Sequence, residues 1–208
     1  MSDQASQSNQ PSQANQGTSL PGTSRPADEA APFRPLGEEL IHQGSVITFL
    51  RGEFEGPDGQ RFHRDIIRHP GAVAVVAVDD GHLFLVRQYR ACLNALLWEI
   101  PAGRRDVSGE PPEITAAREL EEEIGRRPGS VELLINVHHS PGFCDELGHI
   151  FLATDLTEVP VRRHGPEEQQ MVVARVAGPE AVDMALDGRI TDAKSIAGIL
   201  AAARKLGW

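Results

Sequence analysis

The sequence has few cysteines, few aromatic residues and no long apolar run. Only two cysteines, Cys92 and Cys144, occur among 208 residues, and they form no C-x-x-C pair, which argues against a disulfide scaffold and a zinc site. We expect both to be free thiols. The longest apolar runs, such as 72–78 and 196–203, are far shorter than the roughly 20 residues that a membrane helix needs, so no membrane partner is expected.

The first 36 residues also have almost no aliphatic side chains. They are rich in Gln, Ser, Asn, Pro and Gly and cannot bury enough apolar surface to offset the entropy of ordering, so 1–36 is predicted to be a disordered tail. The segment has neither the basic start nor the apolar stretch of a secretory signal, which makes the cytoplasm the expected compartment. The remaining length is compatible with one domain.

The chain is acidic, with a formal net charge of −10. This charge disfavours nonspecific attraction to nucleic acid, so we expect no nucleic-acid partner. It would also repel an anionic substrate unless local cations reverse the field. A protein of this charge that acts on phosphates therefore needs a metal ion, arginines or both.

Turn signals divide the chain into many strands and a few helices. Residues 56–59 (GPDG) would join strands at 44–55 and 61–68 into a hairpin, and 79–81 (DDG) would join strands at 72–78 and 82–89. Further strands are expected at 98–100, 131–138, 149–154 and 171–176, and helices at 112–124, 179–186 and 192–206. This order predicts an α/β or α+β sandwich in which helices cover a mixed sheet.

The helix at 112–124 begins with prolines and ends before Gly125. At 100° per residue, one side collects the apolar residues and nearly the opposite side collects the acids, namely Ile114, Ala117, Leu120 and Ile124 against Glu119, Glu122 and Glu123. Glutamates three and four residues apart repel by roughly 0.2–0.5 kcal/mol per pair unless a cation lies among them. Their oxygens suit Mg²⁺, and Mn²⁺ would also fit. Charge spacing alone favours a solvated acidic face instead.

The order of residues around this helix is more specific than the charge pattern. Gly103 and Glu110 precede the segment RELEEEIG at 118–125, which resembles the Nudix hydrolase box, G-x5-E-x7-R-E-U-x-E-E-x-G-U, where U is a bulky apolar residue. The sequence departs from the box twice. Six residues rather than five separate Gly103 from Glu110, and Arg126 takes the last apolar position. The extra residue falls in a loop, where insertions are tolerated.

The resemblance implies a fold and a metal site. The fold is the Nudix α/β/α sandwich with a mixed sheet over residues 71–208, preceded by an antiparallel strand region at 37–70. The principal metal ligands would be Glu119 and Glu123, joined by Glu122 and by the backbone carbonyl of Ala102.

The same resemblance assigns supporting roles around the metal. Arg118 would orient the carboxylates without binding the metal itself, and Glu110 would brace the loop. Gly103 would lie at the substrate site. Glu121 projects toward the edge of the apolar face, so we expect it to form a peripheral salt bridge.

Hydrolysis also needs a group that accepts a proton from water. The loop at 140–146 (SPGFCDE) supplies two acids, and here the chain resembles the ADP-ribose pyrophosphatases within the family. Pro141 falls 15 residues after Arg126, as in that subfamily, and the glutamate assigned there as the general base matches Glu146. Asp145 in the same loop is the alternative base.

Three further residues are binding candidates by resemblance to that subfamily. Segments 88–90 (QYR) and 98–103 (WEIPAG) resemble its substrate-binding segment, which makes Arg90 the expected phosphate contact. Trp98 is a candidate for contact with the adenine, with a core position as the alternative. Segment 62–65 resembles one that the partner subunit contributes, so Arg64 is a binding candidate and a homodimer with crossing N-terminal strands is implied.

The histidines suggest a metal site less strongly than the glutamates do. His138 and His139 are adjacent at the end of an expected strand, where neighbouring side chains point to opposite faces. For this pair and for His149, solvent or core positions are therefore favoured over metal binding.

The implied reaction is the hydrolysis of ADP-ribose, a small nucleotide conjugate, to AMP and ribose 5-phosphate. The first alternative is another nucleoside diphosphate sugar as substrate. A second is a noncatalytic Nudix module that senses ADP-ribose, although such modules commonly lose box carboxylates that this sequence keeps. A third is a structural interaction protein that uses its acidic surface.

Overall fold

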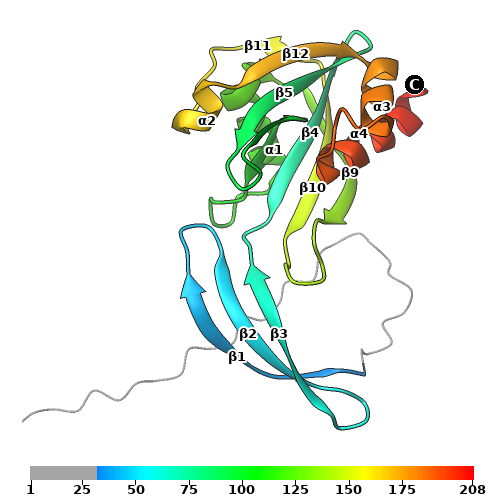
Figure 1. Cartoon of the computed structure of the whole chain (residues 1–208). Helices are drawn as coiled ribbons and strands as arrows, with labels where there is room; N and C mark the ends of the chain where they lie inside the picture. Colours follow the sequence, from blue (N-terminus) through cyan, green and yellow to red (C-terminus); the bar gives the residue numbers. More distant parts are fainter. Residues whose placement is uncertain (1–31) are drawn as a thin grey trace, which may run out of the picture.

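The computed structural model describes residues 32–208 (Figure 1). Residues 1–31 of the predicted tail lie outside this range. Residues 34–36, which the tail prediction included, instead begin strand β1 (Arg34–Gln43). The resemblance implied strands from residue 37 onward, but the local pattern did not predict this one, because nearly all of its side chains are exposed and its sequence shows no apolar alternation. Within the described residues, no helix combines the length and the apolar character needed to cross a membrane.

The N-terminal strands form a separate three-stranded antiparallel sheet. Its order is β1-β2-β3, with β2 at Thr48–Glu55 and β3 at Arg61–Arg68. The predicted hairpin between β2 and β3 is confirmed, and the Gly59 N–H donates to the Gly56 carbonyl at 3.0 Å in its turn. Figure 1 shows this sheet projecting from the rest of the molecule.

A seven-stranded sheet forms the centre of the main body. Its path is β12-β5-β4-β10-β9, with β6 paired to β5 and β7 paired to β4. Strand β10 runs parallel to β4 and the other pairs are antiparallel, so the sheet is mixed, as predicted. The strands are β4 (Ala72–Asp79), β5 (His82–Arg90), β6 (Ala95–Glu99), β7 (Ala102–Arg104), β9 (Ser130–His138), β10 (Leu147–Thr154) and β12 (Val172–Ala177).

Strands β4 and β5 pair with each other only next to their turn, through Val78 with Leu83 and Asp79 with His82. Farther from the turn, β6 pairs along β5 and the short strand β7 pairs along β4. Residues 95–104 therefore lie where β4 and β5 separate. Two very short strands, β8 (Arg126–Arg127) and β11 (Thr157–Glu158), pair outside this sheet.

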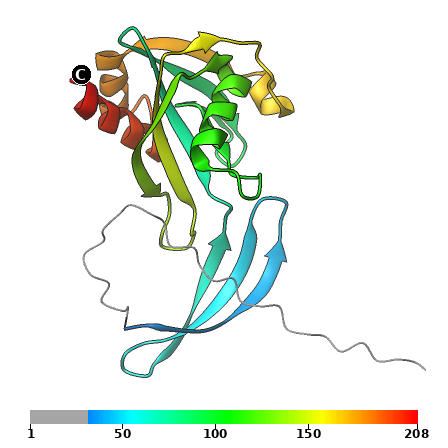
Figure 2. The same ribbon diagram turned by 180° about the vertical axis from the view of Figure 1, so that it is seen from behind.

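Helices cover both faces of the main sheet. They are α1 (Pro112–Ile124), α2 (Gly165–Gln169), α3 (Gly178–Leu186) and α4 (Ala193–Leu206). Alternation along β4 separates two cores: Val73 and Val75 pack with α1, whereas Ala74 and Val76 pack with α3 and α4. Figure 2, seen from behind, brings α1 to the front. The α/β/α sandwich is therefore confirmed.

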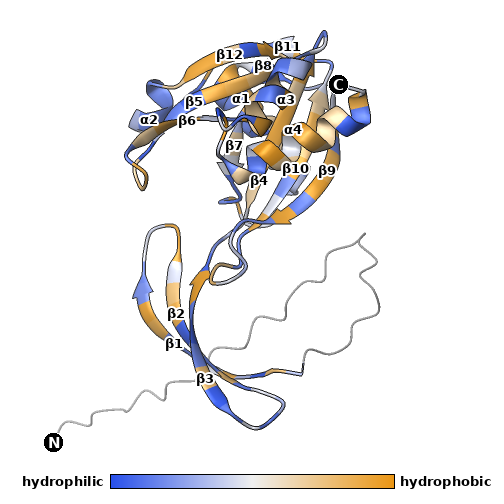
Figure 3. Cartoon of the chain, turned by 45° about the vertical axis from the view of Figure 1, so that its right-hand side comes forward, coloured by the Kyte–Doolittle hydropathy of each residue, from blue (hydrophilic) through white to orange (hydrophobic). Residues whose placement is uncertain are grey.

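Hydropathy distinguishes the main body from the N-terminal sheet. Figure 3 shows hydrophobic residues concentrated on β5, β12 and α4, whereas the three N-terminal strands mix hydrophobic and hydrophilic residues. Several large apolar side chains of the N-terminal region are exposed, among them Leu40, Ile41 and Ile47. The main body has a buried core on each side of its sheet, and the N-terminal sheet contributes to neither core.

Helix α1 has the predicted bounds and the predicted end. Gly125 adopts a left-handed conformation with a φ of 66°, and a Cβ there would approach the Val159 carbonyl oxygen to 2.7 Å. Only glycine meets both conditions.

The predicted core face of α1 was partly wrong. Ile114 is 53% exposed, and the buried apolar residues are Ala116, Leu120 and Ile124. Two of the glutamates are buried beside them instead of facing solvent. The helix is turned so that its acidic side packs against β7, which hydrophobic periodicity could not reveal.

Arg126 stands at the box position that is usually apolar, and its long side chain packs there on an aromatic ring. Its guanidinium lies over the Phe84 ring at 5.1 Å from the centroid, and it forms a 2.6 Å ion pair with Glu158. A stacked arginine covers the ring as an apolar side chain would, while its charge is paired at the surface.

Candidate active site

The acidic side of α1 borders a cavity of about 580 Å³, which we call the helix cavity. Its lining includes the three box glutamates, Arg118 of the same helix, and Arg90, Gly103 and Arg104 of strands β5 and β7. Strands β5 and β7 therefore place basic side chains opposite a carboxylate cluster.

Glu123 is the most deeply buried of the three glutamates. It is 3% exposed, and its Oε2 accepts a hydrogen bond from the Ala102 N–H at 3.0 Å. Burial, reinforced by the nearby Glu119, raises the pKa of Glu123 to about 8 despite this hydrogen bond. Burial disfavours the charged form of a carboxylate, which is why this pKa lies above its usual range.

Glu119 lies against the backbone of β7. It is 9% exposed, and a Cβ on Gly103 would overlap its carboxylate, so only glycine leaves room for it. Burial raises the pKa of Glu119 to about 7, against the opposing charge of Arg118 and with a contribution from Glu122. Gly103, a predicted site residue, therefore acts on the site by making space for a carboxylate.

Arg118 is the hub of the ion pairs on this side of the helix. Its Nη1 lies 2.9 Å from Glu119 and donates to Glu122 at 3.1 Å, while its Nη2 lies 3.5 Å from Glu110. Glu110 also accepts a hydrogen bond of 2.7 Å from Thr115 Oγ1. This geometry agrees with the roles predicted for Arg118 and Glu110. Glu121 instead pairs with Arg127 at 2.6 Å, as expected of a peripheral residue.

The donor set suits a hard divalent cation, although the side chains are not gathered around one point. No group of three His, Cys, Asp or Glu side chains within residues 32–208 is arranged to hold a metal ion. The reason is visible in the contacts, because Arg118 attracts Glu119 and Glu122 while Glu123 turns to the Ala102 N–H. Glu119 and Glu122 share one arginine, and the pKa values of Glu119 and Glu123 are raised, so the three carboxylates nevertheless form a site that a cation would stabilise.

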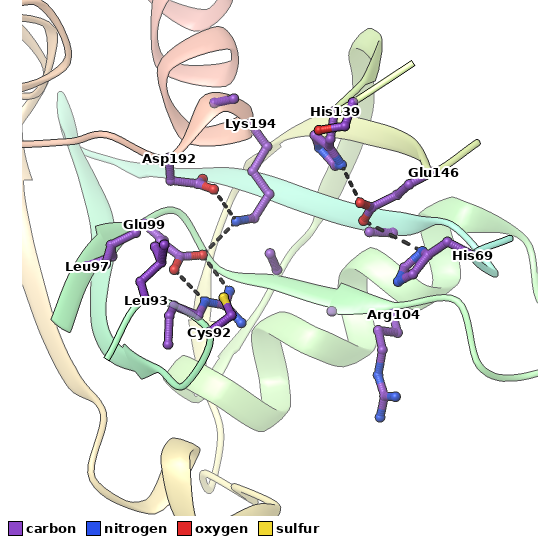
Figure 4. A pocket seen from close by; sticks show the side chains of 16 residues that line it. His69, Cys92, Leu93, Leu97, Glu99, Arg104, His139, Glu146, Asp192 and Lys194 are labelled. Carbon is purple, nitrogen blue, oxygen red and sulfur yellow. Dashed lines mark hydrogen bonds and ion pairs between the residues drawn. The ribbon is translucent and has the colours of Figure 1, made fainter. Parts of the chain in front are cut away.

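A second cavity of about 620 Å³, the loop cavity, adjoins the first (Figure 4). The two share the lining residues Arg90, Ala102, Gly103 and Arg104, so together they form one groove. Glu146 lines the loop cavity. The groove therefore connects the carboxylate helix to the loop that carries the candidate base.

The structure separates the two candidate bases. Glu146 faces the groove, where the hydrogen bond from His139 lowers the pKa of its carboxyl although partial burial opposes this effect. Asp145 turns away, because its carboxylate accepts hydrogen bonds from Arg68 at 3.0 Å and from the His69 N–H at 2.9 Å. Of the two acids, only Glu146 lines the groove.

Arg90 lies in both cavities and belongs to a buried ionic network. Its Nε and Nη2 donate to Glu99 at 2.6 and 2.5 Å. Glu99 is 1% exposed and also accepts a hydrogen bond from Lys194 at 2.6 Å, and Lys194 in turn pairs with Asp192 at 2.8 Å. Although burial opposes it, Arg90 and Lys194 together lower the pKa of Glu99. The network fixes the Arg90 guanidinium at the wall of the groove.

Two predicted binding residues do not line the groove of this chain. Trp98 is half-buried against the core of α3 and α4, because its neighbours Leu97 and Glu99 take the opposite face of β6 and line the loop cavity. This favours the core position for Trp98. Arg64 lies on β3 over the Phe62 ring and lines a different cavity beside the N-terminal sheet.

Sequence reasoning missed several residues of the groove, among them His69, Glu99, Arg104 and Lys194. Glu99 and Lys194 are 95 positions apart, and neither the strand that carries Glu99 nor the helix start beside Lys194 has a motif that signals an ion pair. His139 was expected in solvent or in the core but contacts Glu146. His149 is buried as expected, with Nδ1 2.8 Å from Asn136 Oδ1. Both cysteines are free, as expected.

Comparison with known proteins adds three findings. A family model described as NUDIX domain matches residues 67–198. An ADP-ribose pyrophosphatase of Mycobacterium tuberculosis is 40% identical to this chain over 170 residues, covering 81% of this chain and 82% of that protein, and one of Bacillus subtilis is 38% identical over 163 residues, covering 78% and 88%. A crystal structure of an ADP compounds hydrolase superposes with a TM-score of 0.75 at 22% identity, covering 84% of this chain and 94% of that chain, which supports the fold.

Proposed function

The chain belongs to the Nudix family of hydrolases, and from this premise we propose that it splits the pyrophosphate bond of ADP-ribose to give AMP and ribose 5-phosphate. The observation that carries the proposal is the single groove between α1 and the loop at 140–146. It brings the box glutamates, basic side chains and Glu146 to one space. Two relatives at 38–40% identity that are named ADP-ribose pyrophosphatases support this choice of substrate.

The basic residues of the groove would bind the diphosphate. Arg90 uses Nε and Nη2 for Glu99, which leaves Nη1 for a phosphate oxygen. Arg104 lines both cavities and makes no ion pair or hydrogen bond through its side chain with residues 32–208, so its guanidinium can turn toward the substrate. These two positive charges would offset the negative field of the protein at the place where an anion must enter.

The glutamates of α1 would hold Mg²⁺, with Mn²⁺ as the alternative. Glu119, Glu122 and Glu123 would supply carboxylate oxygens, and Ala102 would add its backbone carbonyl. When bound, the cation would neutralise phosphate charge and favour ionisation of the attacking water. Arg118 would then remain paired with Glu110 and release Glu119.

Glu146 would accept the proton from the attacking water. Its carboxylate is ionised at neutral pH, since its pKa lies below the usual range, and it faces the groove from the loop. The proton moves from the water oxygen to a Glu146 oxygen as the water attacks phosphorus and the bridging oxygen leaves with the other phosphate.

We further propose a homodimer and a cytoplasmic location. The N-terminal sheet projects from the main body and exposes Leu40, Ile41 and Ile47, which a second copy could cover, and Arg64 would then act in the partner's groove. Light scattering after size exclusion would test the dimer, and a monomer at micromolar concentration would contradict it.

The proposed cytoplasmic location is supported by Cys92, which is an exposed free thiol and suits a reducing compartment.

A substrate panel with Mg²⁺ tests the proposed reaction. ADP-ribose, ADP-glucose, GDP-mannose and nucleoside triphosphates are compared, and products are identified by chromatography. We expect ADP-ribose among the best substrates, with AMP and ribose 5-phosphate in equal amounts and with activity lost after chelation. Preference for another nucleoside diphosphate sugar would overturn the choice of substrate.

Two further outcomes would point to a different class of function. ADP-ribose that binds with micromolar affinity and is not hydrolysed with either cation would indicate a sensor. If neither Mg²⁺ nor ADP-ribose binds in calorimetry, the glutamates have no metal role, as in a structural interaction protein.

A further inference from the structure

The carboxylate of Glu146 lies between two imidazole rings, as Figure 4 shows. His139 Nδ1 is 3.0 Å from Oε2, and His69 Nδ1 is 3.6 Å from Oε1. An ionised carboxylate only accepts hydrogen bonds, so the ring nitrogen of His139 carries the hydrogen in the shorter contact. Both rings are largely buried, with 17% and 13% of their side chains exposed.

The two rings do not act alike on the carboxylate. The Gly71 N–H donates to His69 Nδ1 at 3.1 Å, so this nitrogen presents a lone pair and offers no hydrogen to Glu146. Of the two rings, His139 is the one that donates a hydrogen bond to the carboxylate. Oxygen Oε1 therefore keeps its lone pairs for a donor in the groove.

The backbone of the loop is held by other groups. The Ile67 N–H donates to the Phe143 carbonyl at 2.7 Å, and the Asp145 N–H donates to the Ile67 carbonyl at 3.1 Å. The Asp145 side chain adds its contacts to Arg68 and His69. These contacts hold the path of the loop without the His139 side chain, which contacts the side chain of Glu146 instead.

The His139 ring is itself fixed by a glycine. A Cβ on Gly148 of β10 would come within 2.8 Å of His139 Cε1 and 2.9 Å of Nε2, so the ring packs directly on the strand backbone. Its Nε2 is buried and has no hydrogen-bond partner among residues 32–208. The ring is thus seated in one orientation and interacts through Nδ1 alone.

We propose that His139 is a positioning residue for the base: it holds Oε2 of Glu146 and so directs Oε1 into the groove. The proposal rests on the proposed role of Glu146. The charged or titratable groups that face this carboxylate are His139 after β9, His69 after β3 and Lys194 at the start of α4. The His139 hydrogen bond acts most strongly to lower the pKa of Glu146, and the charge of Lys194 acts in the same direction.

The test measures kcat and KM against pH at saturating Mg²⁺ for His139→Leu and His139→Asn. Leucine removes the donor, so we expect kcat to fall about tenfold, KM to change less than about twofold, and the acid limb of kcat to move up by about one pH unit. Asparagine places an amide N–H near the position of Nδ1 and should restore most of kcat and the acid limb.

The adjacent histidine provides a matched control. His138 is exposed and lines the cavity beside the N-terminal sheet, on the other side of the strand end. His138→Leu should therefore leave kcat and the pH profile unchanged. Thermal unfolding of each variant checks the fold, and His139→Ala replaces His139→Leu with the same expected result if the leucine variant does not fold.

Glu146→Gln separates the two ways in which the idea can fail. Were this variant as active as the parent protein, the base assignment and the positioning role would both be overturned. A nearly inactive Glu146→Gln beside a His139→Leu with the parent's kcat and acid limb would overturn the positioning role alone.

Discussion

The two ends of the groove hold carboxylates in opposite electrostatic states. At the helix end, burial raises the pKa of Glu119 to about 7 and that of Glu123 to about 8. At the loop end, the hydrogen bond from His139 lowers the pKa of Glu146. Glutamates of one groove thus differ in proton affinity, because burial disfavours the ionised form at one end and a hydrogen bond favours it at the other.

Glu123→Gln should produce the largest effect at the helix end. Activity should fall at least about a thousandfold, because a neutral amide binds a divalent cation poorly. The transition state would then lose the stabilisation that the positive charge of the cation supplies. The variant without metal should unfold at a higher temperature than the parent protein at pH 8, since a buried charge is gone. Kinetics and calorimetry check both results, and an active variant would contradict the metal role.

Substitutions of the two neighbouring acids at the loop end, Glu146 and Asp145, should have different effects on kcat. Glu146→Gln should lower kcat roughly 10²–10⁴-fold, the usual contribution of a general base. Asp145→Asn should lower kcat less than about tenfold, because Asp145 does not line the groove and its carboxylate is held by Arg68 and the His69 N–H. Steady-state kinetics on both variants decides the point, and the reverse order would make Asp145 the base.

Gly103→Ala tests the close contact between β7 and the helix. The new methyl group would overlap the Glu119 carboxylate, so that side chain must move. We expect activity to fall about tenfold to a hundredfold and stability to fall by about 1–3 kcal/mol, as for other overpacked sites. Gly142→Ala, where the structure has open space for a Cβ, is the control and should unfold at the parent's temperature. An unchanged Mg²⁺ affinity in Gly103→Ala would argue against the ligand role of Glu119.

The smallest expected effect is a pH dependence of stability. From pH 4.5 to about 8 the unfolded chain gives up protons that Glu119 and Glu123 keep when folded, so their contribution to stability falls as pH rises through this window. Added Mg²⁺ should therefore raise the unfolding temperature more at pH 8 than at pH 5. Equal shifts at both values would contradict the pairing of the cation with these acids.

One buried histidine makes a control necessary in that experiment. Burial lowers the pKa of His149, so its contribution to stability increases as pH rises through the ordinary histidine range. Because the parent protein and Glu123→Gln both contain His149, the difference between them is free of the His149 contribution to stability. The variant should lose less stability than the parent protein between pH 5 and 8.

Local signals predicted most of the fold. Strand β3 and helix α1 have their predicted bounds, because turn residues and helix stops such as Gly125 act over a few positions. The sheet was correctly expected to be mixed, and its strand order appears only in the structure, since pairing of β4 with β10 joins residues far apart in sequence. Strand β1 was missed because its side chains are exposed and carry no apolar alternation.

Only the site residues that belong to a sequence motif could be predicted from the sequence. The box identified Glu119, Glu122 and Glu123 as candidate metal ligands, whereas helical periodicity placed them opposite the core, because periodicity cannot tell that β7 covers two of them. His139 and Lys194 reach the groove through tertiary packing alone. Residues whose role depends on a partner 7 or 95 positions away leave no local pattern to recognise.

The short connection between the two sheets couples the N-terminal strands to the loop that carries Glu146. Only residues 69–71 separate β3 from β4, and within them the His69 ring lies 3.6 Å from Glu146 while the His69 N–H donates to Asp145. Ile67, at the end of β3, is bonded to the backbone of the same loop. Because residues 67–69 bond to the loop that carries Glu146, a displacement of the projecting sheet would be transmitted to the backbone beside that residue.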